Sequence, residues 1–332
     1  MAISDNANGA PASEPTGAET PRHRQAVGVW KTVLWGAACL SLALSVYIIF
    51  NLGTITGYVP FETQYFYALQ AVLLPLVFIV FPFRGGGGAR VPRVDIVLAV
   101  LTFLIFAYFA FSGREIMDTG WEYDAPTIGV IASFLAWVII LEATRRAGGT
   151  MLFVVCLFFS VYPAVGFMLP GFLETPQNDW SFAGTYHVFG TESVIGLPTS
   201  VFAQLIIGYL LFGVALQYTG GGEFFLNLAF ALLGRYRGGP AKVAVVASGM
   251  MGSLSGSVVS NVLTTGVMTI PAMKKVGFRP SYTAGVEACA STGGALMPPI
   301  MGAAAFIMAF VLSVPYGSIV IAAVIPSFLY YL

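Results

Sequence analysis

Two polar interruptions of a hydrophobic stretch constrain the fold of this chain more than any other feature. The first is SLSGS at residues 253–257, with Ser260 and Asn261 close behind, and the second is STGGALMPP at residues 291–299. Unwound backbone at membrane depth leaves N–H and C=O groups unpaired, so it is tolerated only inside protein or beside a watery cavity. We therefore interpret both breaks as parts of a binding site. The plain alternative is two kinked helices whose small residues allow close packing.

Composition places these breaks in a polytopic, all-α membrane protein. Apolar residues make up 57% of the chain and charged residues 9%, against roughly 45–50% and 25% in soluble domains. The formal net charge of zero gives no reason to expect a nucleic-acid partner. The chain has no phosphate-binding loop with its lysine, so we expect an ion gradient, not ATP, as the energy source. Its cysteines and histidines are too scattered for a metal site, and we expect no cofactor.

Six apolar runs of near-spanning length precede the broken region. They lie at about 32–52, 65–83, 94–112, 126–142, 150–172 and 197–218, each near the roughly 20 residues that a helical span needs. Residues 1–25 lack an apolar core, so we expect a disordered cytoplasmic tail and not a secretory signal.

Basic residues alternate with the predicted spans and set the orientation. With the tail inside, the outer connections contain Arg114 alone. The inner connections contain the remaining basic residues of this part of the chain: Arg22, Arg24, Lys31, Arg84, Arg90, Arg93, Arg145, Arg146, Arg235, Arg237 and Lys242. The positive-inside rule therefore predicts a multi-pass membrane protein with a cytoplasmic N-terminus.

The same rule predicts a re-entrant hairpin over residues 243–273. Lys242 precedes this segment, and Lys274 and Lys275 follow it, so both of its ends prefer the inner side. Thirty-one helical residues reach roughly 46 Å, too little for two crossings of a ~30 Å core. The tip then falls near residues 255–257. The next run, 281–312, crosses outward with its break at Gly293–Gly294 and Pro298–Pro299, and residues 220–240 form either a helix along the inner interface or an ordinary loop.

These breaks supply the candidate site residues. Ser257 and Asn261 lie four residues apart on one helical face, and their oxygens suit a hard cation such as Na⁺. The predicted ion-binding residues are Ser255, Gly256, Ser257, Asn261, Gly293 and Gly294. The predicted substrate-binding residues are Ser260, Ser291, Thr292, Pro298 and Pro299. Glu287, a carboxylate inside an apolar run, either couples to the ion or forms a structural ion pair with Lys274, Lys275 or Arg279.

The segments GGGEFF…LLGRYRGGPAKVAVVASGMMGSLSGSVVSNV, GFRPSYTAGVEACASTGG and MPPIMGAAAFIMAF resemble the membrane permease of tripartite ATP-independent periplasmic (TRAP) transporters. The resemblance is to the fused type, TAXI-like, in which small and large membrane subunits form one polypeptide. It covers about residues 190–332, whereas residues 30–170 resemble the small subunit mainly in helix count. The resemblance implies a sodium-driven secondary transporter of a bacterial inner membrane, with an elevator-like motion, that receives a small organic anion from a periplasmic binding protein. The family's hairpin tip corresponds to Ser255, Gly256, Ser257 and Asn261, but this chain has Ala295 and Phe310 where fused members often carry a glutamine and an acidic residue.

The resemblance also implies a division of the chain. Residues 1–25 form the tail, 26–175 the small-subunit-like region, and 176–332 the first repeat of the large-subunit-like transport region. The family builds its site from two inverted repeats, and residues 1–332 hold only the first, so we expect an N-terminal portion of a longer protein. The outer segments 113–126 and 174–192 are where a periplasmic partner would dock, although ordinary solvated loops remain open.

Two other functions compete with a carrier. An ion channel could also use backbone carbonyls as a filter, but two non-identical breaks in one chain suit an asymmetric carrier better. A symporter without a binding protein is a further alternative. An intramembrane enzyme would need a nucleophile–base pair or a metal motif, and the spacing of the Ser, His and Glu residues shows none, so we expect no enzyme.

The charge pattern makes a direct prediction about topology. Single cysteines at Asp118 and Asp179 should react with an impermeant thiol reagent added outside intact cells, whereas cysteines at Arg235 and Lys274 should react only after the inner face is opened. The reverse labelling pattern would show that the orientation is inverted.

Overall fold

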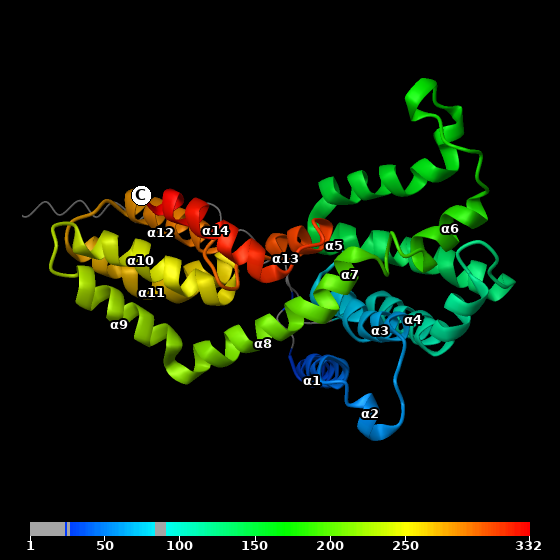
Figure 1. Cartoon of the computed structure of the whole chain (residues 1–332), viewed down its shortest axis with the longest axis horizontal. Coiled ribbons are helices and arrows are strands. Elements are labelled where there is room, and N and C mark those ends of the chain that lie inside the picture. The colour runs from blue at the N-terminus through cyan, green and yellow to red at the C-terminus, as the bar shows by residue number, and fades with distance from the viewer. Residues whose placement is uncertain (1–23, 25–26, 84–90) are drawn as a thin grey trace, which may run out of the picture.

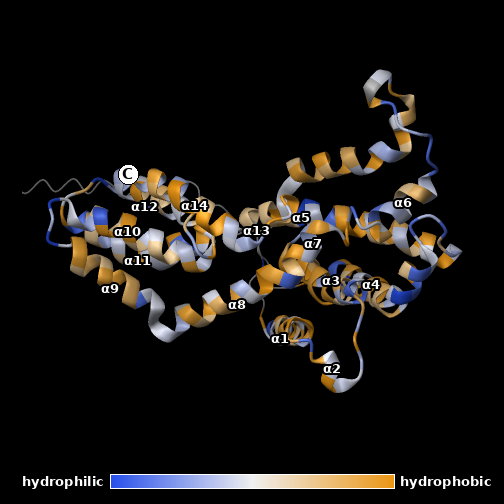
Figure 2. Cartoon of the chain, viewed as in Figure 1, coloured by the Kyte–Doolittle hydropathy of each residue, from blue (hydrophilic) through white to orange (hydrophobic). Residues whose placement is uncertain are grey.

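The computed structural model describes residues 24, 27–83 and 91–332, and all regular secondary structure in these ranges is helical (Figure 1). Five helical stretches among them are long and apolar enough to cross a membrane. Figure 2 shows apolar residues along most helices and hydrophilic residues mainly at their connections. The expected all-α polytopic membrane fold is thereby confirmed. Apart from Arg24, the predicted tail 1–25 lies outside the described residues, as do Arg84 and Arg90.

The first group of helices packs around an aromatic core. It comprises α1 (Val29–Ile49), α2 (Gly53–Thr56), α3 (Glu62–Val80), α4 (Arg93–Thr119), α5 (Thr127–Val165), two short 3₁₀ turns (Gly166–Met168 and Gly171–Leu173) and α6 (Trp180–Phe189). Phe109 packs edge-on against Phe189 with ring centroids 5.0 Å apart, and Phe189 packs edge-on against Trp121. The buried Tyr67 hydroxyl donates to the Val188 carbonyl at 2.8 Å. These contacts fasten α3 and α4 to α6 and the outer connections.

Helix α5 contains two of the predicted spans. The expected runs 126–142 and 150–172 are two legs joined at Gly149, whose φ of 86° and ψ of 172° are not helical. A positive φ is readily adopted only by glycine, which is why the chain turns there. His187 of α6 lies 2.6 Å from the Ser160 carbonyl and holds the second leg. Five candidate spans therefore stand where six were expected, because two runs share one element.

A buried ionic cluster closes one end of this group. Asp95 accepts from Arg24 Nη2 at 2.6 Å and from Arg146 Nη1 at 2.8 Å, and all three side chains are at most 6% exposed. Arg146 also pairs with Glu142 at 2.7 Å. Arg24 donates to the last-turn carbonyls of α3, through its guanidinium to Phe78 and Ile79 and through its backbone N–H to Val80. The cluster therefore neutralises buried charge and satisfies carbonyls that a helix end leaves unpaired.

The second group contains both interrupted segments. It comprises α7 (Leu197–Val201), a π-helical turn (Phe202–Ile206), α8 (Ile207–Leu216), a second π-helical turn (Gln217–Gly221), α9 (Gly222–Leu233), α10 (Gly239–Ser255), α11 (Val258–Lys275), α12 (Pro280–Gly294), α13 (Ala303–Val311) and α14 (Tyr316–Tyr331). Helices α10, α11 and α12 contact one another, and α9 packs on α10 through Leu226, Ala229, Val243 and Ala247. Residues 220–240, expected to form either an interfacial helix or a loop, thus contain helix α9. The chain bends between α8 and α9 at Gly220, whose φ and ψ are not helical.

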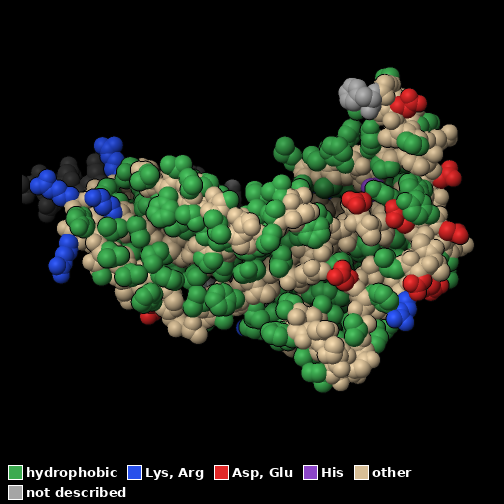
Figure 3. Space-filling view, in the orientation of Figure 1, with side chains coloured by type: hydrophobic (Ala, Val, Ile, Leu, Met, Phe, Trp, Pro, Cys, Tyr) green, Lys and Arg blue, Asp and Glu red, His purple; other side chains and the backbone are tan. Residues whose placement is uncertain are grey.

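Charged side chains separate along the molecule. In Figure 3 most visible Lys and Arg side chains gather where α9, α10, α11 and α12 are joined at their ends, and most visible Asp and Glu side chains gather at the opposite end, around α4 to α6. Separation of basic from acidic side chains is the pattern on which the positive-inside rule depends, and which end is cytoplasmic stays a prediction.

Asp95→Asn should destabilise the protein. Removing one charge leaves Arg24 and Arg146 buried without their shared carboxylate, a change that costs about 3–5 kcal/mol. The matched control is Asp118→Asn at an exposed position, where about 0.5 kcal/mol or less is expected. Thermal unfolding in detergent should show a midpoint several degrees lower for Asp95→Asn only, and equal midpoints would contradict the role assigned to the cluster.

Candidate functional site

The hairpin turns at Gly256 and Ser257, between α10 and α11. Gly256 has a φ of 58°, and a Cβ there would lie 2.0 Å from the Met301 carbonyl oxygen. Only glycine fits such a contact. The Ser257 hydroxyl accepts from the Ser260 N–H at 3.3 Å and caps the start of α11. The sequence therefore builds a tight tip that presses against the second break.

The two interruptions lie against each other. The Ile300 N–H donates to the Ser253 carbonyl at 3.1 Å, which joins the second break to the end of α10. Gly302 donates to the Ala295 carbonyl at 2.7 Å, and the Tyr316 hydroxyl donates to the Pro299 carbonyl at 2.9 Å. One of these hydrogen bonds joins the two interruptions, and the other two satisfy polar backbone of the second break from within it and from α14.

The second break begins later than the sequence indicated. Helix α12 continues through Gly293 and Gly294, and the irregular segment is 295–302. A Cβ on Gly252 would lie 2.2 Å from the Gly294 Cα, so these two glycines bring α10 and α12 into backbone contact. The Gly293 and Gly294 carbonyls accept from Leu296 and Met297 at 3.0 and 3.1 Å. Placing the unwinding at the glycines was wrong, because close helix packing outweighs their weak helix propensity.

Asn261 holds an unpartnered oxygen beside this junction. The side chain is fully buried, and its Nδ2 donates to the Ser248 carbonyl at 2.7 Å. Among the described residues, nothing pairs with its Oδ1. A buried acceptor without a partner costs about 1–3 kcal/mol, so this oxygen is available to a cation or a hydrogen-bond donor.

Glu287 lies in a ring of hydroxyl groups between the three helices. It is 1% exposed. One oxygen lies 2.5 Å from Thr265 Oγ1, 3.0 Å from Ser248 Oγ and 3.3 Å from Ser291 Oγ, and the other lies 2.5 Å from Thr269 Oγ1. Ser248 joins the two features, since its carbonyl binds Asn261 and its hydroxyl binds Glu287. The carboxylate and the amide thus form one polar core.

The expected ion pair of Glu287 is absent from the described part of the chain. Lys274, Lys275 and Arg279 are exposed near the far ends of α11 and α12, whereas Glu287 faces α10 and α11. Eight helical residues, about 12 Å, separate Arg279 from Glu287. The structural alternative for Glu287 is therefore a hydroxyl network and not a salt bridge.

The candidate serines lie around a small cavity. Ser255, Ser257 and Ser260 line a space of about 110 Å³ against Leu210, Gly213 and Val214 of α8. The other substrate candidates do not line it: Ser291 belongs to the Glu287 network, Thr292 is exposed and donates to the Ala288 carbonyl, and Pro298 and Pro299 belong to the break beside Tyr316. Sequence reasoning missed Ser248, Thr265 and Thr269. The four-residue spacing of Asn261, Thr265 and Thr269 was the available signal.

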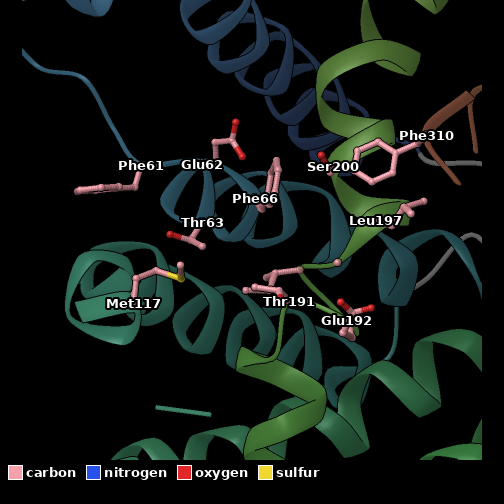
Figure 4. A pocket seen from close by; sticks show the side chains of 12 residues that line it. Phe61, Glu62, Thr63, Phe66, Met117, Thr191, Glu192, Leu197, Ser200 and Phe310 are labelled. Atoms are coloured by element: carbon pink, nitrogen blue, oxygen red, sulfur yellow. The ribbon is translucent and has the colours of Figure 1, made fainter. Parts of the chain in front are cut away.

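A second cavity lies between the two groups of helices (Figure 4). It measures about 510 Å³ and combines Glu62 and Thr63 of α3, Met117 of α4, Glu192 of the connection before α7, and Phe310 of α13. Met117 lies within the first predicted outer segment, 113–126, and Glu192 is the last residue of the second, 174–192. The cavity carries two carboxylates among apolar walls.

Comparison with known proteins places these features in a family. Residues 135–332 match the family described as the tripartite ATP-independent periplasmic transporter, DctM component. The C4-dicarboxylate TRAP transporter large permease protein DctM of Pseudomonas aeruginosa is 33% identical over 156 residues, 45% of this chain and 36% of that protein. The sialic acid TRAP transporter permease protein SiaT of Haemophilus influenzae is 22% identical over 213 residues, 64% of this chain and 31% of that protein.

An uncharacterized protein, y4mL of Sinorhizobium fredii, is 32% identical over 132 residues, 40% of this chain and 31% of that protein. The chain thus spans about a third of the length of these curated relatives. No solved structure matches it. The family match begins within α5, ahead of the boundary expected at residue 176.

Gly252→Ala should weaken the junction. The added Cβ would meet the Gly294 backbone, so α10 and α12 must separate, at a cost of about 1–3 kcal/mol. Gly285→Ala is the matched control, because a Cβ on Gly285 of α12 meets nothing within 4 Å. We expect a lower unfolding midpoint for Gly252→Ala and an unchanged or higher one for Gly285→Ala. Two equal midpoints would argue against the glycine contact.

Proposed function

Because the chain belongs to the DctM component family of tripartite ATP-independent periplasmic transporters, we propose that it is the permease of a secondary transporter. We propose further that this transporter is driven by sodium and carries small organic anions. One observation carries the proposal: two interrupted helical segments meet at a tip where the buried Asn261 Oδ1 has no partner among the described residues. Irregular backbone and unpartnered oxygens at such a depth are the means by which carriers hold ions.

The proposed sodium site centres on Asn261. Its Oδ1 is a neutral oxygen ligand of the kind that a hard cation prefers, and the carbonyls that end α10 lie at the negative end of that helix. Ser255, Gly256, Ser257, Gly293 and Gly294 remain its proposed neighbours. Glu287, connected to Asn261 through Ser248, supplies the negative charge that favours a cation in this core.

The proposed substrate site is the serine-lined cavity at the start of α11. A helix N-terminus favours negative charge, and the Ser260 hydroxyl can donate to a carboxylate. Two relatives are named for C4-dicarboxylates and for sialic acid, and both names denote carboxylic acids, which supports an anionic substrate here. About 110 Å³ holds little more than a few waters at roughly 30 Å³ each. We therefore propose that this cavity forms one wall of the substrate site, with Ser291, Thr292, Pro298 and Pro299 near it.

The cavity with Glu62 and Glu192 is the proposed docking point of a periplasmic binding protein. Its carboxylates and apolar walls suit a basic side chain with an aliphatic stem. Gln204 Nε2 donates a hydrogen bond to Glu62 Oε1 at 3.3 Å, which orients the carboxylate, and Glu62 remains exposed. In the proposed inner-membrane orientation this cavity faces the periplasm, and residues 26–175 act as the fused small subunit.

Uptake into proteoliposomes tests the function. The complete transporter, with its binding protein outside, should accumulate a carboxylate only under an inward sodium gradient. Saturable counterflow would distinguish it from a channel, and full uptake without the binding protein would instead support a simpler symporter.

Asn261→Ala and Ser257→Ala should raise the sodium concentration needed for half-maximal uptake, because each removes a proposed oxygen ligand. Glu287→Gln should do the same by removing the charge while keeping a group that hydrogen-bonds the surrounding hydroxyls. Val259→Ala, exposed on the same hairpin, is the control and should match the parent protein. Unchanged sodium dependence in all three variants would remove this polar core from the ion site.

Glu62→Gln combined with Glu192→Gln should weaken docking. We expect a higher binding-protein concentration for half-maximal uptake, by roughly 5- to 30-fold for the loss of one or two charge contacts, with unchanged sodium dependence. Glu223→Gln, at an exposed position outside this cavity and outside both predicted outer segments, is the control. An equal effect of the control and the double variant would show a general charge effect and not a docking point.

A further inference from the structure

One end of the second group of helices carries basic side chains without acidic partners. Helices α10 and α11 form a hairpin, so the start of α10 and the end of α11 lie at the same end, where Figure 3 shows Lys and Arg side chains together. All six are exposed, and none forms an ion pair within the described ranges 24, 27–83 and 91–332. We call these six residues the basic end: Arg235, Arg237, Lys242, Lys274, Lys275 and Arg279.

Aromatic and aliphatic side chains stand exposed among these charges. Lys242 Nζ lies 5.6 Å from the centroid of the Tyr236 ring, and Tyr236 is 61% exposed. In the other turn the Phe278 and Tyr282 rings stack with centroids 5.7 Å apart, and Tyr282 is also exposed. Val276 is exposed beside them. The surface is therefore both cationic and partly apolar.

The positive-inside rule alone does not require this lack of acids. Asp and Glu contribute little to orientation, so acids can stand beside the basic residues that set a topology. The first group shows such a mixture, since Arg24 and Arg146 share Asp95, and Arg145 and Arg146 bind Glu142. Between residues 224 and 286, by contrast, the sequence contains no Asp or Glu. The charge of the basic end is thus available to an anion from outside the protein.

We propose that the basic end binds the headgroups of anionic phospholipids, with the lipid phosphates at its Lys and Arg side chains. Clusters of four to eight basic residues at the end of membrane helices attract anionic lipids, and tyrosine rings are favoured at the level of the headgroups. A lipid layer offers both chemistries at one depth, because its phosphates meet the charges and its upper acyl region covers the exposed apolar side chains. This inference rests on charge and exposure and does not depend on the transported substrate or the coupling ion.

Native mass spectrometry of the 332-residue chain in detergent tests the proposal. Phosphatidylglycerol and phosphatidylcholine with identical acyl chains are added in a titration. We expect phosphatidylglycerol to bind at least roughly tenfold more tightly. Raising the ionic strength should reduce this preference, because salt screens exposed charges.

Neutral variants locate the binding surface. Arg235→Gln, Arg237→Gln and Lys242→Gln together should lower the affinity for phosphatidylglycerol at least roughly fivefold, with the affinity for phosphatidylcholine unchanged. Substituting glutamine for the three basic residues of the other turn, 274, 275 and 279, should have the same effect. A charge-conserving triple variant, Arg235→Lys, Arg237→Lys and Lys242→Arg, should keep the preference. Since these side chains are exposed, all variants should unfold at the same temperature as the parent chain.

The control removes the same number of charges elsewhere. Lys31→Gln, Arg93→Gln and Arg114→Gln together change three basic residues that are exposed outside the basic end, and this variant should keep the preference for phosphatidylglycerol. Equal affinity of the parent chain for both lipids would overturn the proposal. Equal losses in the control and in the variants of the basic end would also overturn it, because they would show an effect of net charge and not a binding surface.

Discussion

The requirement that buried backbone polar groups find partners governs this structure. Helices meet it within themselves, but an interrupted helix must meet it through a neighbour. Here the neighbour is another interruption: Ile300 donates to the Ser253 carbonyl, and Gly256 accepts the close approach of Met301 because it has no Cβ. The second break also pairs within itself, through Gly302 and Ala295, and with Tyr316 of α14, and the glycine contact between α10 and α12 brings the two interrupted segments together.

Much of the fold could be predicted from sequence, because membrane-spanning segments are recognised by their length and hydropathy. The helical nature of the chain, the turn of the hairpin at residues 256–257 and the contact between the two breaks follow from apolar runs punctuated by serine, glycine and proline. The position of the second break did not follow. A glycine pair predicts either unwinding or close packing, and only the presence of Gly252 opposite Gly294 decides between them.

The surroundings of Glu287 could be predicted even less. A lone carboxylate near a lysine pair suggests an ion pair, yet rotation of α12 directs it toward hydroxyls from Ser248, Thr265 and Thr269. Such facing depends on how three helices are rotated about their axes, which sequence spacing constrains only within each helix. Glu287 therefore contributes both the negative charge of the proposed ion site and hydrogen bonds between α12 and the two helices of the hairpin. Binding of an ion there would also change how these three helices pack.

The π-helical turn at Phe202–Ile206 has a consequence for changes in chain length. An i→i+5 turn accommodates one residue more than an α-helical turn, and here it leaves the Ala203 carbonyl to accept from the Tyr65 hydroxyl at 2.8 Å. Deleting one residue within this turn would let a regular α-helical turn close with α8 in nearly the same rotational phase, although the Ala203 carbonyl would no longer be free for Tyr65. Deleting one residue in the regular part of the helix after the turn would instead rotate everything beyond it by about 100°. Gly213, whose absent Cβ lets α8 approach the Leu254 carbonyl, would then face elsewhere and present a bulkier neighbour to the hairpin. The irregular turn is therefore the point before α8 where the chain can lose one residue with the least effect on the hairpin.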